Sequence, residues 1–288
     1  MMEFRYDLFI SELHFHIQSP KPIQLPDCFR PFAVSSPPAG TPDIFLEVFI
    51  GGAPLHIDPD VKRLSENVYI LQGQIVQRYH WKNEEYIVRI DSVGRGTPCR
   101  LYIPEAFADA FCARGNWLNY LALERLLIPY GRIILHASAV LYRGKAYLFT
   151  APSGGGKSTH AALWAQYFGA EIINGDKTVI QADASGCRAF GSPVAGSSGI
   201  FRNIGAPIAA IFLLKKSCRN HISIQHQPAN YFSLYSETVK SSWDMKFNRN
   251  LLDLLEIVLD NIPILTLECT PEKEAVQCVL DYMERMKE

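Results

Sequence analysis

Over the first third of the chain, apolar and polar residues alternate in short runs, a pattern typical of half-buried β-strands. Proline, glycine and serine, which favour turns, separate the runs. We therefore expect residues 1–104 to form a β-rich N-terminal region that could offer a strand edge to an extended peptide or other substrate. The runs, rich in β-branched and aromatic residues, are 43–50, 68–81 and 85–91.

After Pro104 the spacing changes, and apolar residues recur every three or four positions, as they do on one face of a helix. This spacing ends at Pro129 and Gly131, and both residue types stop helices. We expect 105–130 to form a helix that links the N-terminal region to a larger catalytic domain over 131–288.

Strand and helix patterns follow one another closely in this second domain. Strands are predicted over 132–142 and 146–150, and so short a connection predicts a hairpin, because a parallel pair needs a crossover of a dozen or more residues. The helix predicted next ends at Gly169. The domain as a whole is predicted to be α/β with a mixed sheet. The other expected elements are strands over 170–176, 206–216 and 262–269, a hairpin around Ser185-Gly186, and helices over 157–169, 241–261 and 271–288.

Composition narrows the functional classes. The 288 residues carry a formal net charge of -1, and this lack of a basic excess argues against a nucleic-acid partner. The longest apolar run, 208–214, is far shorter than the roughly 20 residues that cross a bilayer, so no membrane partner is expected. The 7 cysteines are scattered without a C-x-x-C pair, which favours reduced thiols and a cytoplasmic protein.

The segment 151–159, APSGGGKST, carries the strongest chemical signal. It matches the phosphate-binding pattern G-x-x-x-x-G-K-[ST], with Ala151 in place of the first glycine. In this pattern the glycines let the backbone wrap phosphate, the lysine contacts the outer phosphates and the hydroxyl binds Mg²⁺. A predicted strand precedes the loop and a predicted helix follows it, so we expect a site for ATP, or another nucleoside triphosphate, and Mg²⁺. The expected nucleotide-binding residues are Ser153, Gly154, Gly155, Gly156, Lys157, Ser158 and Thr159.

Two residues outside the loop are candidates for the chemistry. Asp176 ends the strand that follows the loop helix, where a carboxylate can ligate Mg²⁺ or accept a proton from an attacking hydroxyl. His136 lies on the strand that pairs with the one leading into the loop, so it could approach the transferred phosphate. We predict Asp176, His136 and Lys157 as catalytic residues, and Ser158 and Asp176 as metal ligands.

The sequence leaves two interpretations open for His160, and two for the pair His14 and His16. His160 follows the loop and either approaches the nucleotide or faces solvent. His14 and His16 share one face of a strand and could ligate a metal, but no third ligand is evident in the sequence. A solvated strand is therefore the favoured interpretation of that pair.

In order along the chain, ILHASAV, a hairpin, APSGGGKST, a short helix and IINGD resemble the catalytic domain of HPr kinase/phosphorylase. The segment is most similar to the HPr-kinase-like proteins of modified-peptide gene clusters, for example those of lasso peptides. ATP-dependent phosphoenolpyruvate carboxykinases are similar in fold. The later segment 191–214 adds to the resemblance, with a G-[ST]-P-x-x-G loop, an asparagine and a proline-led apolar strand. The resemblance covers about residues 130–285.

This resemblance implies an ATP- and Mg²⁺-dependent kinase that phosphorylates a Ser or Thr hydroxyl of a peptide or small protein, in modified-peptide biosynthesis. Because HPr kinases form oligomers, it also implies a possible homo-oligomer. Asp176 would take the proton from the substrate hydroxyl. The implied substrate loop consists of Gly191, Ser192, Pro193 and Gly196, with Arg202 neutralising phosphate charge.

The chain also departs from this family. Relatives carry two consecutive aspartates where this chain has Gly175-Asp176, so Asp176 is either the proton acceptor or only a metal ligand. The signature with which HPr kinases recognise HPr has no clear counterpart, so we expect another substrate. Two alternatives stay open: a kinase for a small metabolite such as free serine or a sugar, and a nucleotide-dependent peptide-binding module that transfers no phosphate.

Overall fold

The computed structural model describes residues 2–36, 40–51, 60–80, 86–91, 96–114, 118–194, 196–224 and 227–286. Two compact units are present, each with its own sheet. Unit 1 comprises Met1–Tyr130 and Ser242–Met245, and unit 2 comprises Gly131–Ser241 and Lys246–Glu288.

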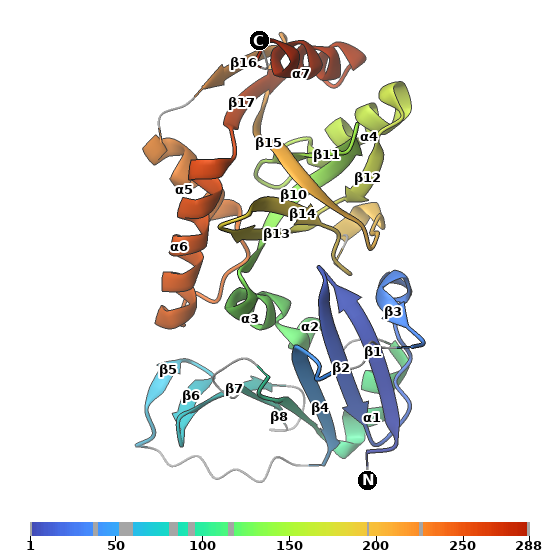
Figure 1. Cartoon of the computed structure of the whole chain (residues 1–288). Coiled ribbons are helices and arrows are strands. Elements are labelled where there is room, and N and C mark those ends of the chain that lie inside the picture. Colours follow the sequence, from blue (N-terminus) through green and yellow to red (C-terminus); the bar gives the residue numbers. More distant parts are fainter. Residues whose placement is uncertain are drawn as a thin grey trace. The chain divides into compact units, whose positions relative to one another are not determined.

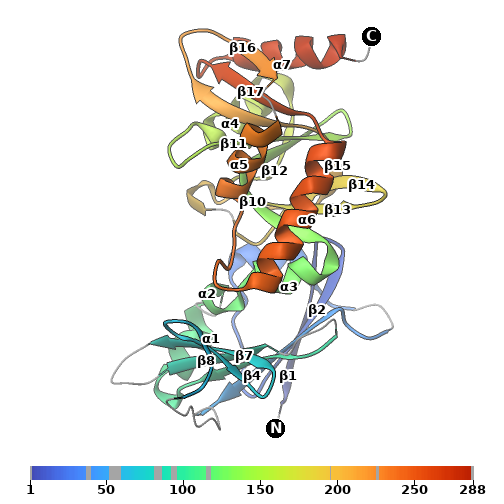
Figure 2. The same cartoon turned by 90° about the vertical axis from the view of Figure 1, so that its left-hand side faces the viewer.

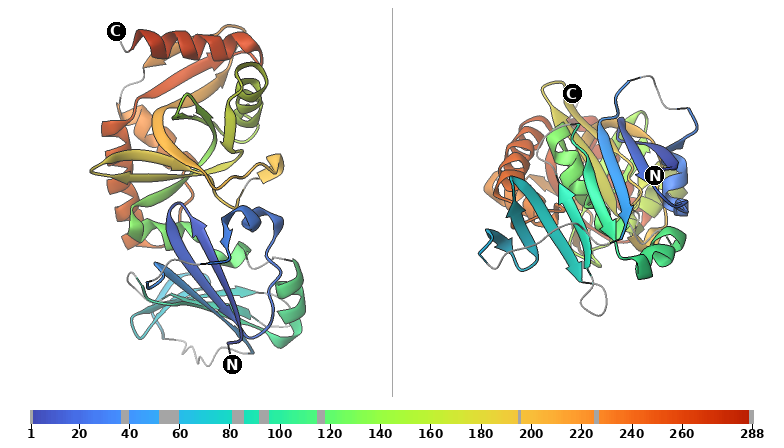
Figure 3. Two further views of the ribbon diagram at one scale, coloured as in Figure 1. Left: turned by 45° about the vertical axis from the view of Figure 1, so that its right-hand side comes forward. Right: turned by 90° about the horizontal axis from the view of Figure 1, so that it is seen from below.

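Unit 1 is built on a nine-stranded sheet in the order β3-β1-β2-β4-β9-β8-β7-β6-β5, counted over the described residues. The predicted β-rich character of this region is confirmed, and the right-hand view of Figure 3 shows its strands side by side. The strands are β1 (Phe4–Ile10), β2 (Leu13–Ser19), β3 (Ala33–Val34), β4 (Ile44–Ile50), β5 (Arg63–Ser65), β6 (Val68–Leu71), β7 (Gln74–His80), β8 (Tyr86–Asp91) and β9 (Cys99–Ile103).

The single helix expected over 105–130 is instead divided into short pieces that belong to unit 1. One division comes at Ala122, whose φ of 41° is outside the right-handed helical region. The pieces that the structure describes are α1 (Ala108–Arg114), α2 (Leu118–Leu121) and α3 (Leu123–Leu127), flanked by 3₁₀ turns over Glu105–Phe107 and Ile128–Tyr130.

Unit 2 holds a mixed sheet, as predicted. Its path is β11-β10-β13-β14-β15-β17-β16, β12 pairs with β10, and β11 also pairs with β15, which closes a ring of strands. Both expected hairpins, β10–β11 and β13–β14, are confirmed as antiparallel pairs. The strands are β10 (Arg132–Tyr142), β11 (Lys145–Thr150), β12 (Glu171–Asn174), β13 (Lys177–Asp183), β14 (Gly186–Phe190), β15 (Gly205–Lys216), β16 (His221–Ile224) and β17 (Ile264–Cys269).

The helices of unit 2 are α4 (Lys157–Phe168), α5 (Gln227–Glu237), α6 (Met245–Asn261) and α7 (Lys273–Arg285). Figures 1 and 2 show α5 and α6 on the side of the sheet opposite α4. Trp164 of α4 is fully buried among Tyr147 and Phe149 of β11 and other apolar side chains, which holds α4 against the sheet. Strand β16 and helix α5 were not predicted from the sequence.

Three parallel strands of unit 2 indicate where a ligand can bind. Strand β15 runs parallel to both β11 and β17, so the carboxyl ends of the three strands lie at one edge of the sheet. In α/β proteins, both with open sheets and with closed barrels, ligands bind at the carboxyl ends of parallel strands. Among the described residues, no helix combines the length and apolar composition needed to cross a membrane.

Candidate active site

The glycine loop joins β11 directly to α4, in the strand-loop-helix context that the sequence predicts. Gly154 and Gly156 have φ values of 76° and 96°, which residues with a Cβ rarely adopt. Gly155 is required for a different reason, because a Cβ there would lie 2.5 Å from the Cβ of Ala151. Ala151 is itself buried and leaves little room for anything larger at the first position of the motif. A small residue at position 151 is thus compatible with the loop geometry.

Lys157 opens α4 and folds back over the loop. Its Nζ donates to the carbonyl oxygen of Ala151 at 2.8 Å and to that of Pro152 at 3.4 Å. Burial lowers the pKa of Lys157, and the carboxylates of Glu237 and Asp176 act in the opposite direction. The ammonium group is therefore held at the loop, in a cavity that Asp176 also lines, where it can bind a phosphate.

Asp176 occupies the turn between β12 and β13, and the buried side chain of Asn174 builds that turn. The Asn174 Oδ1 accepts hydrogen bonds from the backbone N–H groups of Asp176 at 2.9 Å and Lys177 at 2.8 Å. The Asn174 amide donates to the carbonyl oxygen of Ser192 at 3.0 Å, which ties the turn to the next loop. Asp176 is therefore held by backbone contacts and does not depend on its own side chain for its position.

His136 lies between two carboxylates. Its Nε2 is 2.9 Å from Asp176 Oδ1, and its Nδ1 is 3.4 Å from Glu237 Oε2. All three side chains are partly buried, with exposed fractions of 30% for His136, 24% for Asp176 and 15% for Glu237. The hydrogen bond to Asp176, with a second carboxylate near the other ring nitrogen, restricts the orientation of the imidazole, as in the base-orienting pairs of many active sites.

Glu237 was missed by the sequence reasoning. It is the last residue of α5, and the chain just after it follows β10: Leu135 forms a bridge with Thr238, and the Val239 N–H donates to Ile134 at 2.8 Å. This pairing is what brings Glu237 to His136. No motif surrounds Glu237 in the sequence, so only its acidic character could have drawn attention to it.

The loop carrying the expected substrate residues packs against Asp176. Ser192 is fully buried, and its Oγ donates to the Lys177 carbonyl oxygen at 2.6 Å. A Cβ on Gly196 would lie 2.7 Å from Asp176 Cγ, so only glycine allows so close an approach. Gly191 is constrained in the same way by the Arg202 carbonyl oxygen, which a Cβ would meet at 1.8 Å. Pro193, also buried, completes this segment.

Arg202 is placed differently from the expectation. Its guanidinium forms an ion pair with Glu171, at the opposite end of β12 from Asp176, and both side chains are partly exposed. Arg202 is not among the described residues that line the cavity at the glycine loop. Arg202 pairs with Glu171 in this structure, and its expected role in neutralising phosphate charge stays a prediction.

A cavity of about 570 Å³ joins the loop to His136 and Asp176. It extends along α4 past His160 to the carboxyl ends of β15 and β17, as the parallel pairing requires. His160 is buried, and its Nε2 finds no hydrogen-bond partner among the described residues. Burial lowers the pKa of His160 to about 4, so the ring is neutral at physiological pH. The lining residues are His136, Ser153, Gly154, Gly155, Gly156, Lys157, Ser158, Thr159, His160, Leu163, Asp176, Lys216, Ser217, Cys269, Thr270 and Pro271.

Comparison with known proteins adds little to this geometry. No family model and no curated protein matches the chain. Among solved structures, the chain is similar to the Hpr(Ser) kinase/phosphatase from Coxiella burnetii, with 14% identity over 54% of this chain and 91% of that chain, at a TM-score of 0.32. At that level the likeness carries no conclusion about activity, so the chemistry is inferred from the site itself.

Proposed function

We propose that the protein is an ATP- and Mg²⁺-dependent kinase that transfers phosphate to a Ser or Thr hydroxyl of a peptide or small protein. One observation carries this proposal. Lys157 of the glycine loop and the hydrogen-bonded pair His136–Asp176 line the same cavity. A phosphate-binding loop facing a carboxylate that can serve an attacking hydroxyl is the arrangement that phosphoryl transfer requires.

The cavity offers a region suited to each part of a nucleotide. Phosphate groups suit the N-terminus of α4, where backbone N–H groups and the helix dipole favour anions. The nucleoside suits the part of the cavity that extends to Thr270 and Pro271. His160 also lines the cavity, but its ring is buried against Phe149. A cavity of about 570 Å³ is in the usual size range of small-ligand sites.

Oxygen donors suited to Mg²⁺ occur in the same place. The Ser158 hydroxyl and the Asp176 carboxylate both line the cavity. Hard oxygen ligands of this kind are those that Mg²⁺ prefers. When bound, the ion would neutralise charge on the phosphate oxygens. Ser158 and Asp176 are the residues that would hold it.

Three residues of this chain have separate roles in the transfer step. The acceptor hydroxyl oxygen forms a bond to the γ-phosphorus while the bond from that phosphorus to the bridging oxygen of ADP breaks. Asp176 takes the hydroxyl proton, and His136, whose other ring nitrogen lies 3.4 Å from Glu237 Oε2, orients the Asp176 carboxylate through their hydrogen bond. Lys157 stabilises the negative charge on the phosphate oxygens.

The test measures transfer of labelled phosphate from ATP to candidate Ser- and Thr-containing peptides. We expect Lys157→Ala to lower the rate by about 10²–10³-fold and Asp176→Asn by about 10²–10⁴-fold. Matched controls are Lys145→Ala, an exposed lysine at the start of β11, and Asp183→Asn at the end of β13, which should transfer normally. Equal transfer by the wild type and both site variants would reject the kinase.

Two comparisons within the same experiment separate the alternatives. If Glu237→Gln lowers the rate more than Asp176→Asn does, Glu237 is the proton acceptor and Asp176 the metal ligand. Transfer to free serine or a sugar, with none to peptides, would indicate a metabolite kinase. Tight ATP binding by the wild type, without transfer to any acceptor, would indicate a nucleotide-dependent binding module.

A further inference from the structure

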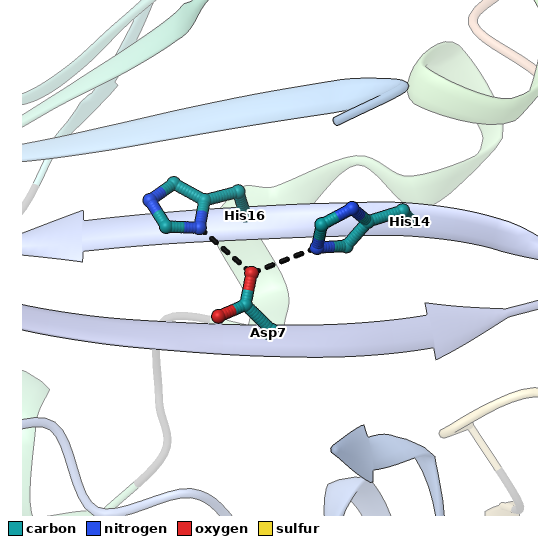
Figure 4. A group of neighbouring side chains, drawn as sticks. All are labelled: Asp7, His14 and His16. Carbon is teal, nitrogen blue, oxygen red and sulfur yellow. Dashed lines mark hydrogen bonds and ion pairs between the residues drawn. The ribbon is translucent and has the colours of Figure 1, made fainter. Parts of the chain in front are cut away.

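A second cluster of chemically competent side chains lies in unit 1, outside the proposed kinase site. His14 and His16 alternate along β2, so their side chains share one face of the sheet. On the neighbouring strand β1, Asp7 lies directly opposite His16. Figure 4 shows both rings turned toward the Asp7 carboxylate. The sequence could not reveal Asp7 as a third partner, because only the register of the β1–β2 hairpin places it there.

The three side chains converge on one point. His14 Nε2 and His16 Nδ1 each lie 2.7 Å from the same oxygen, Asp7 Oδ1. All three candidate ligand atoms lie within 4.8 Å of one another. A tetrahedral Zn²⁺ at about 2.0–2.1 Å from its ligands holds neighbouring ligand atoms roughly 3.4 Å apart. Small side-chain rotations therefore suffice to move from the hydrogen-bonded arrangement to a metal-bound one.

From this convergence we propose that Asp7, His14 and His16 form a site for a divalent transition metal ion, with Zn²⁺ as the reference ion. Two imidazoles and one carboxylate are a ligand set that such ions bind. His14 ligates through Nε2, His16 through Nδ1 and Asp7 through its carboxylate. Three protein ligands leave a coordination position for water or for a group on another molecule.

Neighbouring side chains hold the two rings in place. The His14 ring stacks on Phe9, with ring centroids 5.2 Å apart and planes inclined by 4°. The His16 ring packs on Phe45 at 4.8 Å. Ligands whose orientation is fixed by packing lose less entropy when a metal binds. The site is in this sense already organised.

Gln18 supplies the outer support that a metal-bound histidine needs. Its side-chain amide lies 3.1 Å from Nε2 of His16, the ring nitrogen that would not bind the metal. In metal sites this second nitrogen carries a proton and donates it to a neighbouring acceptor. The Gln18 amide can present its oxygen by turning through 180°, because its oxygen and nitrogen occupy similar positions. The same residue therefore fits both the free and the metal-bound tautomer of His16.

A metal bound here would also join the two strands of a strained hairpin. The β1–β2 turn passes through Ser11 and Glu12, whose φ values are 49° and 65°. Residues other than glycine adopt such values at a cost in free energy. Ligands contributed by both strands would offset this cost, so metal binding is expected to raise the stability of unit 1.

The test titrates the full-length chain, without nucleotide, with Zn²⁺ in a calorimeter and with Co²⁺ in a spectrophotometer. We expect about one ion per chain, and a Co²⁺ spectrum without the charge-transfer band that thiolate ligands produce. His14→Gln, His16→Gln and Asp7→Asn should each abolish this binding. Gln18→Leu, which leaves the ligands in place, should weaken it by about 10–100-fold.

The control is His136→Gln, which removes the histidine that lies between Asp176 and Glu237 in unit 2. This variant should bind zinc as the wild type does. Circular dichroism and thermal melting of each metal-free variant check that it folds. The proposal is overturned if the wild type binds no zinc, or if His136→Gln loses the binding that His14→Gln and His16→Gln retain. Because no nucleotide or phosphate acceptor is present, the result is independent of the proposed kinase activity.

Discussion

At the scale of single residues, the most informative position is Gly175. Relatives suggested by the sequence resemblance carry an aspartate there, yet in this chain a Cβ at 175 would lie 1.9 Å from Ser198 Oγ and 2.6 Å from Ser198 Cβ. Gly175 is not one of the residues with positive φ, so its backbone conformation does not require glycine. The exclusion of larger residues at position 175 is therefore purely steric. Although position 175 carries no aspartate, Glu237 on α5 provides a second carboxylate beside His136.

This steric account predicts that Gly175→Ala destabilises the protein by about 1–3 kcal/mol, the usual cost of overpacking. Ser198→Gly alone removes the hydroxyl that accepts from the Ile200 N–H at 3.4 Å and should cost some stability, whereas in the Gly175→Ala background it should restore most of the loss. Urea unfolding of the four proteins in this double-mutant cycle measures the coupling. A Gly175→Ala variant as stable as the wild type, or one that Ser198→Gly does not rescue, would contradict the account.

At the scale of elements, helix α4 serves both the fold and the site. Its first residue, Lys157, faces the glycine loop, and Trp164 two turns later is fully buried in the core. His160 lies between them, with its ring 4.4 Å from that of Phe149. His160 is buried beside the cavity and does not face solvent, while its approach to a nucleotide stays a prediction. A buried neutral histidine makes the stability of this element depend on pH.

The sign of this dependence follows from the pKa of His160, which burial lowers to about 4 from the usual histidine value of about 6.5. Between these pH values the unfolded chain binds the proton and the folded chain does not, so stability falls as pH falls. We expect the wild type to lose about 2 kcal/mol more than His160→Gln between about pH 7.5 and about pH 5.

Urea unfolding of both proteins at the two pH values measures this difference. Other titrating groups contribute equally to both proteins and cancel in the comparison. Parallel loss of stability in the two proteins would show that His160 is not buried in its neutral form.

At the scale of the whole molecule, each unit has its own sheet, its own buried side chains and its own candidate ligand site. The cavity at the glycine loop is lined entirely by residues of unit 2. The Asp7–His14–His16 cluster belongs to unit 1. A ligand stabilises the structure to which it binds, so nucleotide should act first on unit 2.

We predict that ADP with Mg²⁺, at about 100 times its dissociation constant, stabilises unit 2 by about 2.7 kcal/mol, which slows exchange through its unfolding about 100-fold. Hydrogen-exchange mass spectrometry should show this protection in β10, β11 and β15. Peptides from β1 and β2 should show a smaller change. Lys157→Ala should lose the protection, and equal protection of both units in the wild type would contradict a nucleotide site confined to unit 2.

The sequence by itself determined the features that depend on neighbouring residues. Period-two and period-3.6 patterns predict the β-rich first region, the two hairpins of unit 2 and the helix after the glycine loop, because local spacing decides which face is buried. The loop residues Gly154 to Ser158 are recognisable for the same reason, since their chemistry is contained in one short segment. Helix α5 was missed because its apolar pattern is irregular, with Phe232 71% exposed and Leu234 buried.

Only the tertiary structure decided which distant residues meet. Glu237 reaches His136 through the pairing of the chain after α5 with β10, and Asp7 meets His14 and His16 through the register of the β1–β2 hairpin. Arg202 was assigned to phosphate by its place in a motif, but it pairs with Glu171 across β12. Strand register and long-range packing set these contacts. A one-residue change in the register of β1 would turn the Asp7 side chain to the opposite face of the sheet from His14 and His16. For that reason local sequence could name candidate residues without fixing their partners.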